Sequence, residues 1–115
     1  MSFAHLHTHT EFSILDGSNK IKDYVRRVKA LGMDSAAITD HGVMYGVIDF
    51  YKECKANDIN PILGCEVYVS PGSRFDREVS SGDDRYYHLI LLAENNVGYQ
   101  NLIKIVSTGF IDGFY

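Results

Sequence analysis

Three histidines occupy alternate positions near the start of the chain, at His5, His7 and His9. Side chains on a β-strand alternate between its two faces, so a strand over residues 3–9 would place all three imidazoles on one face. A buried histidine is costly unless it is hydrogen-bonded or ligated, and neighbouring histidines on one face therefore need a common partner. Asp16 supplies a carboxylate in the Ser/Asp/Gly turn that follows. The pattern predicts a metal-binding strand and turn.

The rest of the composition is that of one globular domain. Hydrophobic residues make up 45% and charged residues 23% of 115 positions, which is typical of folded chains. No apolar run approaches the length of a membrane span, and no signal peptide precedes the histidines, so we expect a cytoplasmic protein without a membrane partner. Neither Cys54 nor Cys65 belongs to a CxxC pair, and both are expected to be core thiols. A net charge of −4 argues against a broad basic face for nucleic acid.

Short apolar runs alternate with amphipathic segments along the chain. The spacing predicts a first helix that begins after Ser18 as N-cap and stops at Gly32. A short strand over residues 35–39, buried on both faces, follows this helix. A second helix is expected over residues 44–56, with Met44, Val47, Ile48, Tyr51 and Cys54 on its buried side.

The second half of the chain continues the alternation. A third strand is expected over residues 60–69, and a polar loop over residues 70–85 leads to a strand over residues 86–93. Asn95 then caps a last helix that ends near Ser107. Alternating strands and helices predict an α/β fold with right-handed crossovers.

Further polar residues lie at or near the ends of these strands. Asp40 and His41 follow the second strand, and Glu66 interrupts the third. A buried glutamate needs a cation or a hydrogen-bonding partner, although an exposed edge position is the alternative. Antiparallel pairing of residues 66–69 with the last strand would bring His88 beside Glu66.

Six residues are therefore candidate metal ligands: His7, His9, Asp16, His41, Glu66 and His88. Imidazoles with a few carboxylates suit divalent zinc, manganese or iron, and we expect zinc first among them. Six ligands are too many for one tetrahedral ion, so we expect a cluster of two or three ions with Glu66 as a bridge. Paired ions stabilise the attacking and leaving oxygens in phosphate-ester hydrolysis.

Several sequence blocks, in this order and spacing, resemble the polymerase and histidinol phosphatase (PHP) domain family: HLHTHTEFS, ITDHG, ILGCEVYVS and YYHLILLA. GVIDFYKE, SRFDRE and GYQNL add a narrower resemblance to the N-terminus of bacterial replicative DNA polymerase III alpha subunits. The likeness covers nearly the whole chain. It implies that residues 1–115 are the first, incomplete part of a distorted (β/α)7 barrel with a trinuclear metal centre at the carboxyl ends of its strands.

Position by position, the resemblance assigns metal binding to the same six residues. It places Asp40 beside His41 as the residue that orients this imidazole, and we expect these two residues to serve catalysis. His5 stands where many PHP domains carry an aspartate, and its role stays open. Three further ligands of the family pattern are expected beyond position 115, so the isolated fragment should hold a partial site and be inactive. Its open sheet edge would permit self-association.

The resemblance also implies a function. The parent protein would be the catalytic subunit of the replicative DNA polymerase, with DNA, deoxynucleotides and other replisome subunits as partners. Its PHP domain would be a metal-dependent phosphoesterase that removes misincorporated nucleotides as a 3′→5′ exonuclease. Two alternatives stay open: a free-standing phosphatase for a small phosphomonoester such as histidinol phosphate, and a catalytically silent scaffold.

Overall fold

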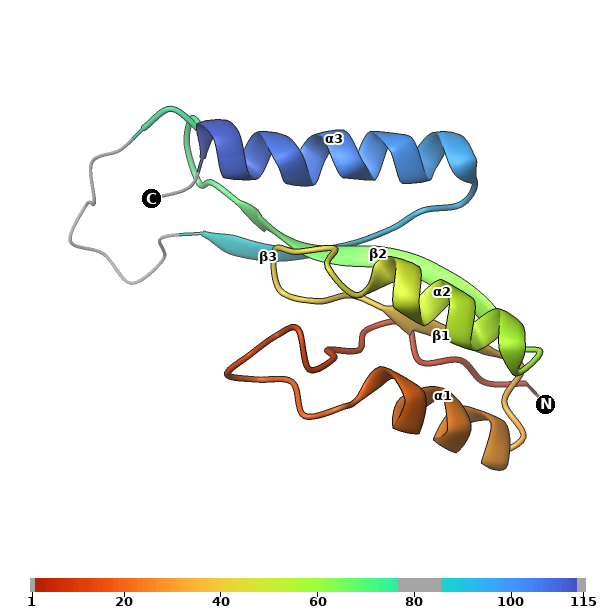
Figure 1. Ribbon diagram of the computed structural model, residues 1–115. Helices are drawn as coiled ribbons and strands as arrows, with labels where there is room; N and C mark the ends of the chain where they lie inside the picture. The colour runs from red at the N-terminus through yellow and green to blue at the C-terminus, as the bar shows by residue number, and fades with distance from the viewer. Residues whose placement is uncertain (1, 77–85, 114–115) are drawn as a thin grey trace.

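The computed structural model describes residues 2–76 and 86–113 and has a mixed α/β architecture (Figure 1). Its elements, in chain order, are α1 (Ile21–Ala30), β1 (Ser35–Ile38), α2 (Val47–Ala56), β2 (Asn60–Val69), β3 (Tyr87–Leu92) and α3 (Asn96–Asp112). Figure 1 shows α3 on one side of the strands and α1 with α2 on the other. The expected α/β class is confirmed. None of the helices in these two ranges combines the length and hydropathy that a bilayer span requires.

The three strands form one sheet in the order β1, β2, β3. β1 runs parallel to β2, from Ser35 opposite Asn60 onward. β3 runs antiparallel to β2 and places His88 opposite Tyr68, so the expected antiparallel pairing is confirmed. β2 is therefore the central strand, and it carries Glu66. Self-association through an outer strand stays a prediction.

The expected first strand over residues 3–9 is wrong. The segment is extended but bends at Leu6 and His7. Two backbone hydrogen bonds join it to β1: Ala37 N donates to His5 O at 3.2 Å, and Thr39 N donates to Thr8 O at 2.9 Å. The segment thus lies along the free edge of β1 without forming a regular ladder.

The spacing of these two bonds explains the irregularity. The acceptors lie three residues apart on the N-terminal segment, whereas the donors lie two apart, on β1 and just after its end. One extra residue therefore interrupts the pairing, as in a β-bulge. An extra residue shifts the alternation of side chains. The ring of His5 packs edge-on against Phe3, with 4.9 Å between ring centroids, and it does not share the position of His7 and His9.

The start of α1 also differs from the prediction, because Lys20 rather than Ser18 is the N-cap and it makes no side-chain cap. Asn19 pairs with the preceding loop instead, because Glu11 N donates to Asn19 O at 3.0 Å. The predicted stop at Gly32 is confirmed, with φ +75°. Gly32 N and the next amide donate back to the last turn, the pattern that commonly ends a helix at a glycine.

At the other end of the chain, the predicted cap of α3 is confirmed. The side chain of Asn95 accepts a hydrogen bond from Gly98 N at 3.0 Å. The helix continues to Asp112 rather than ending near Ser107. The helix continues through Gly109 because a glycine inside a helix costs only about 1 kcal/mol relative to alanine. The last turn also gains a contact, since the centroid of the Phe110 ring lies 6.5 Å from that of Tyr45.

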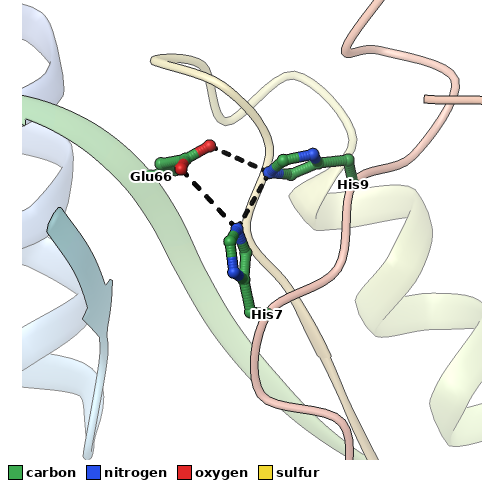
Figure 2. A group of neighbouring side chains, drawn as sticks. All are labelled: His7, His9 and Glu66. Carbon is green, nitrogen blue, oxygen red and sulfur yellow. Dashed lines mark hydrogen bonds and ion pairs between the residues drawn. The ribbon is translucent and has the colours of Figure 1, made fainter. Parts of the chain in front are cut away.

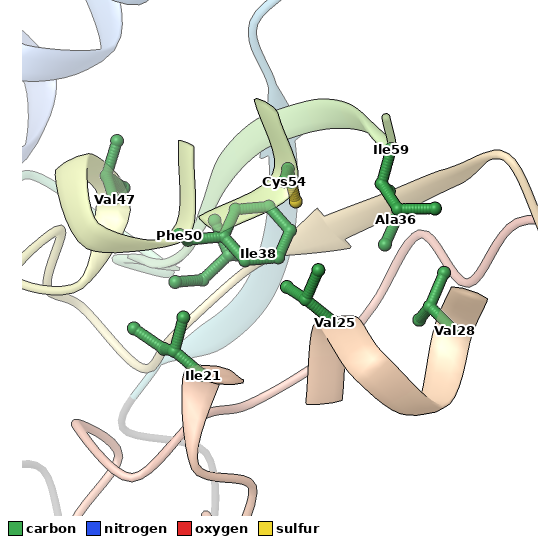
Figure 3. Close-up of a cluster of buried hydrophobic side chains, with 9 residues drawn as sticks. All are labelled: Ile21, Val25, Val28, Ala36, Ile38, Val47, Phe50, Cys54 and Ile59. Atoms are coloured by element: carbon green, nitrogen blue, oxygen red, sulfur yellow. The ribbon is translucent and has the colours of Figure 1, made fainter. Parts of the chain in front are cut away.

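The hydrophobic core lies between the sheet and the two helices α1 and α2 (Figure 3). Its buried cluster comprises Ile21, Val25, Val28, Ala36, Ile38, Val47, Phe50, Cys54 and Ile59. On α2, Ile48 and Tyr51 were expected in the core but are largely exposed, and Phe50 takes their place. The buried face of α2 therefore lies about one residue around the helix from the predicted face, in a helix with about 3.6 residues per turn.

The two cysteines are buried and free, which confirms them as core thiols. Burial raises the pKa of both Cys54 and Cys65 from 9.0 to about 12. The thiolate is the reactive form. Both thiols are therefore protonated and shielded in the folded protein at pH 8.

We predict that iodoacetamide at pH 8 leaves Cys54 and Cys65 unmodified in the native protein, because a pKa raised to about 12 keeps each thiol protonated until the pH rises far above 9. The same treatment in denaturant should label both. Mass spectrometry of the two cysteine peptides measures the outcome. Rapid native labelling of either cysteine would contradict the described packing.

Candidate metal centre

The candidate ligands come from separate parts of the chain and meet beside β2. The N-terminal segment supplies two imidazoles, the following turn a carboxylate, the loop after β1 an imidazole, and β2 and β3 one ligand each. The residues brought together are His7, His9, Asp16, His41, Glu66 and His88. All six were identified from the sequence, and His5 lies apart from them.

Glu66 is the centre of this group. It is 3% exposed, and its backbone continues the pairing of β1 and β2: Glu66 N donates to Asp40 O at 3.0 Å, and Gly42 N donates to Glu66 O at 2.8 Å. These two bonds flank His41 and hold it directly against Glu66. Strand pairing alone therefore fixes the position of two of the six candidate ligands.

The carboxylate of Glu66 contacts imidazoles through both oxygens. Oε2 lies 2.5 Å from His41 Nδ1 and 2.9 Å from His9 Nε2. Oε1 lies 3.2 Å from His88 Nδ1 and 3.6 Å from His7 Nε2. Figure 2 shows the rings of His7 and His9 converging on this carboxylate. A single buried acid thus joins four imidazoles.

Asp16 completes the group on its exposed side. Its Oδ2 accepts a hydrogen bond from His41 Nε2 at 2.6 Å and lies 3.4 Å from His9 Nδ1. The hydrogen bond from His41 lowers the pKa of the Asp16 carboxyl below its usual value. Asp16 is therefore an anionic ligand candidate at neutral pH.

The donor atoms fit divalent metal ions. Two groups each place their donors within 4.8 Å of one another: His7, His9 and Glu66, and His9, Asp16 and His41. His9 belongs to both groups, contacting Glu66 through Nε2 and Asp16 through Nδ1. Imidazole and carboxylate donors in such sets suit zinc, manganese or iron.

Two close contacts support this fit. His7 Nε2 and His9 Nε2 face one another at 3.1 Å. His41 Nδ1 lies 2.5 Å from Glu66 Oε2, yet it lacks hydrogen-bond geometry and is a buried polar atom without a hydrogen-bond partner among the described residues. Buried polar atoms are normally satisfied. A cation shared by these donors would satisfy both pairs.

Asp40 serves a different purpose from the one expected. It is 1% exposed, and its carboxylate accepts hydrogen bonds from Thr10 N at 2.5 Å, Thr10 Oγ1 at 2.7 Å and Ser13 Oγ at 2.8 Å. It reaches His41 only through Ser13, whose Oγ accepts from His41 N at 3.1 Å. Asp40 therefore anchors the loop that follows His9, and among the described hydrogen bonds its carboxylate makes none to the His41 ring.

Thr10 and Ser13 also belong to the site, although the sequence pattern did not indicate them. Both are buried, and hydroxyl residues in a polar turn beside two histidines were the available signal. Gly17 closes the same loop, because a Cβ at this position would lie 1.8 Å from Thr10 O. The loop from Thr10 to Gly17 is thus fixed by one buried carboxylate and one close backbone approach.

This chain is similar in sequence to proteins of known family. The model of the PHP domain family matches residues 5–115. DNA polymerase III subunit alpha is 50% identical to this chain over 115 residues in Treponema pallidum, 46% over 115 residues in Chlamydia pneumoniae and 46% over 118 residues in Thermus aquaticus. Each alignment covers the whole chain but only 9 or 10% of the relative. The chain therefore spans about a tenth of the length of these curated relatives.

Solved structures share the fold. An amidohydrolase from Chromobacterium violaceum, solved with bound sulfate and no metal, superposes with a TM-score of 0.61 at 23% identity, over 91% of this chain and 34% of its own. A protein described as a metal-dependent phosphoesterase from Bifidobacterium adolescentis gives a TM-score of 0.60 at 21% identity, over 88% and 32%. These likenesses agree with the α/β class, and the chain corresponds to about a third of either neighbour.

Replacing Glu66 should release metal. We predict that Glu66→Gln in the full-length protein loses most of the bound divalent metal, because an amide cannot supply the negative charge that joins the four imidazoles. Glu94→Gln, an exposed site away from the centre, is the matched control and should retain it. Elemental analysis after gel filtration measures both. Equal metal content in the two variants would contradict the assignment of Glu66.

Asp40→Asn tests the anchor of the loop. An amide offers one acceptor oxygen for three donors, so we expect the loop to loosen and metal affinity to fall roughly 10- to 100-fold. Asp49→Asn removes the same charge from an exposed position on α2 and should leave affinity unchanged. Competition with a chelator measures the difference. Unchanged affinity in Asp40→Asn would show that the loop does not need this carboxylate.

Proposed function

Because the chain belongs to the PHP domain family, we propose that it is the N-terminal portion of a metal-dependent phosphoesterase domain in a bacterial DNA polymerase III alpha subunit. Its relatives of that name are 46 to 50% identical over the whole chain. The reaction we assign to the domain is hydrolysis of the terminal phosphodiester of a DNA strand, a 3′→5′ exonuclease that removes misincorporated nucleotides. We place the protein in the cytoplasm, with DNA, deoxynucleotides and other replisome subunits as partners.

One observation carries the proposal: a buried glutamate contacts four imidazoles, and a second carboxylate, Asp16, contacts two of the same rings. His7, His9 and Glu66 would hold one divalent ion and His9, Asp16 and His41 another, with zinc first and manganese or iron as alternatives. Bound there, such ions supply Lewis acidity and a hydroxide near neutral pH. His41 thus serves as a ligand candidate in direct contact with the reacting centre.

The protein's own side chains hold the candidate ligands in place and leave one side of the metal centre open to substrate. Glu66 and Asp40 are buried and keep the ligands on β2 and the loop in fixed places. His7 and His88 contact Glu66 through one ring nitrogen each, and about half of either side chain is exposed: 53% and 49%. Substrate would therefore approach from the side of these two rings.

The direct test uses the full-length protein with His9→Ala. His9 belongs to both donor groups, so we predict that exonuclease activity falls by roughly 100-fold, whereas polymerisation of deoxynucleotides changes little. His5→Ala removes an imidazole two residues away that lies outside the group and should retain both activities. Release of terminal nucleotides and primer extension are measured in parallel.

Three outcomes of this test would contradict the proposal. Equal loss of both activities in His9→Ala would deny a separate hydrolytic site. Hydrolysis of small phosphomonoesters without hydrolysis of DNA would favour a phosphatase. Absence of hydrolysis in the wild-type protein, with no effect of a chelator on thermal stability, would favour a scaffold.

A further inference from the structure

Three aromatic rings continue outward from the candidate metal centre along one face of β2 and β3. Tyr68 lies two residues after Glu66 on β2 and therefore shares its face. His88 stands opposite Tyr68 on β3, and Tyr86 lies two residues before His88. We call Tyr68, His88 and Tyr86 the aromatic row. Figure 1 shows the two strands side by side, with β2 running through the middle of the fold.

The rings of the aromatic row contact one another. The centroid of His88 lies 5.2 Å from that of Tyr68 and 5.7 Å from that of Tyr86, to which it is nearly parallel at 14°. The two tyrosine rings are 4.8 Å apart. Such separations are favourable for aromatic pairs. His88 Nδ1 also lies 3.2 Å from Glu66 Oε1, so the row is joined directly to the metal centre.

The row is exposed although it is rich in ring carbon. Tyr68 is 47% exposed and Tyr86 50% exposed. Part of the Tyr68 ring packs closely against the backbone at Gly42, just after His41. This approach requires glycine, because the backbone there has φ +63° and a Cβ would lie 3.1 Å from the ring. Contiguous exposed apolar side chains beside a polar site, rather than single ones, are typical of a binding surface.

We propose that the aromatic row is a stacking platform for the base of the terminal nucleotide of a single-stranded DNA, whose last phosphodiester lies at the metal centre. This inference rests on the proposed phosphoesterase function and names how its substrate is held. Two residues of strand separate Glu66 from Tyr68, about 7 Å, and the sugar of a nucleotide bridges its phosphate and its base.

Two properties of the chain favour this occupant. Base stacking on aromatic rings tolerates every base, since each base has a π-face, and an enzyme that removes any misincorporated nucleotide needs such tolerance. The net charge of −4 makes a strongly basic groove for the DNA backbone a poor source of affinity in this part of the protein. Stacking then provides the main contact to the nucleotide outside the metal centre.

Binding can be tested without hydrolysis. The full-length protein, with chelator present, is titrated into single-stranded DNA that carries 2-aminopurine at its 3′ end, whose fluorescence is quenched on stacking. We expect Tyr68→Leu and Tyr86→Leu to raise Kd roughly 5- to 100-fold. Tyr68→Phe and Tyr86→Phe keep the ring and should retain most of the affinity. Tyr51→Leu, on the exposed face of α2, is the matched control.

Turnover supplies an independent readout. With metal bound, the leucine variants should raise KM for a strand with a normal 3′ base much more than they lower kcat. On a strand whose terminal nucleotide is abasic, wild type and leucine variants should be alike. The proposal is overturned if leucine and phenylalanine variants lose binding equally, if the leucine variants bind as wild type, or if normal and abasic termini respond equally.

The two hypotheses fail in different ways. A wild-type protein that hydrolyses no DNA, but whose 2-aminopurine quenching still depends on Tyr68 and Tyr86, would support the platform and overturn the exonuclease. A protein that hydrolyses DNA with unchanged KM in both leucine variants would support the exonuclease and overturn the platform.

Discussion

The buried carboxylate of Glu66 is the constraint on which this end of the fold depends. Taking an ionised acid out of water costs several kcal/mol unless charges or hydrogen bonds compensate it. Four imidazoles and no lysine or arginine contact Glu66 in the described ion pairs. Divalent cations held among these donors would supply the positive charge that compensates such a carboxylate. Burying Glu66 among these imidazoles is therefore unfavourable without a cation, whereas the same side chains form a metal centre when a cation is bound.

The scaffold around Glu66 fixes its partners by three separate means. Backbone pairing of β1 with β2 places His41, and antiparallel pairing of β2 with β3 brings His88 to the same carboxylate. The remaining ligands lie on the N-terminal segment and its loop, which two backbone hydrogen bonds, without a regular ladder, join to the edge of the sheet. Asp40 adds three hydrogen bonds to Thr10 and Ser13, which fix the loop. Rigid elements thus supply half of the centre, and one buried acid secures the rest.

Sequence patterns predicted β1, β2 and β3 because each is an apolar run bounded by turn residues, and they predicted the ligands because histidine and glutamate are conspicuous beside such runs. The prediction of an N-terminal strand was wrong for a physical reason. A single extra residue between two backbone hydrogen bonds cannot be seen in the alternating histidines of the sequence, but it turns His5 away from His7 and His9. The role of Asp40 was also beyond reach, since its partners lie 27 and 30 residues away along the chain. Only the fold shows which acid binds metal and which binds the loop.

A metal centre requires cations bound where these side chains meet, and anomalous X-ray scattering from crystals of the full-length protein would detect them. Data collected on both sides of the absorption edge of zinc, and likewise of manganese and iron, identify each ion and its position together. We predict anomalous peaks in contact with Glu66 and the imidazoles of His9 and His41. Well-ordered side chains at these positions with no anomalous peak between them, in crystals grown with the metal that the protein retains on purification, would contradict the account.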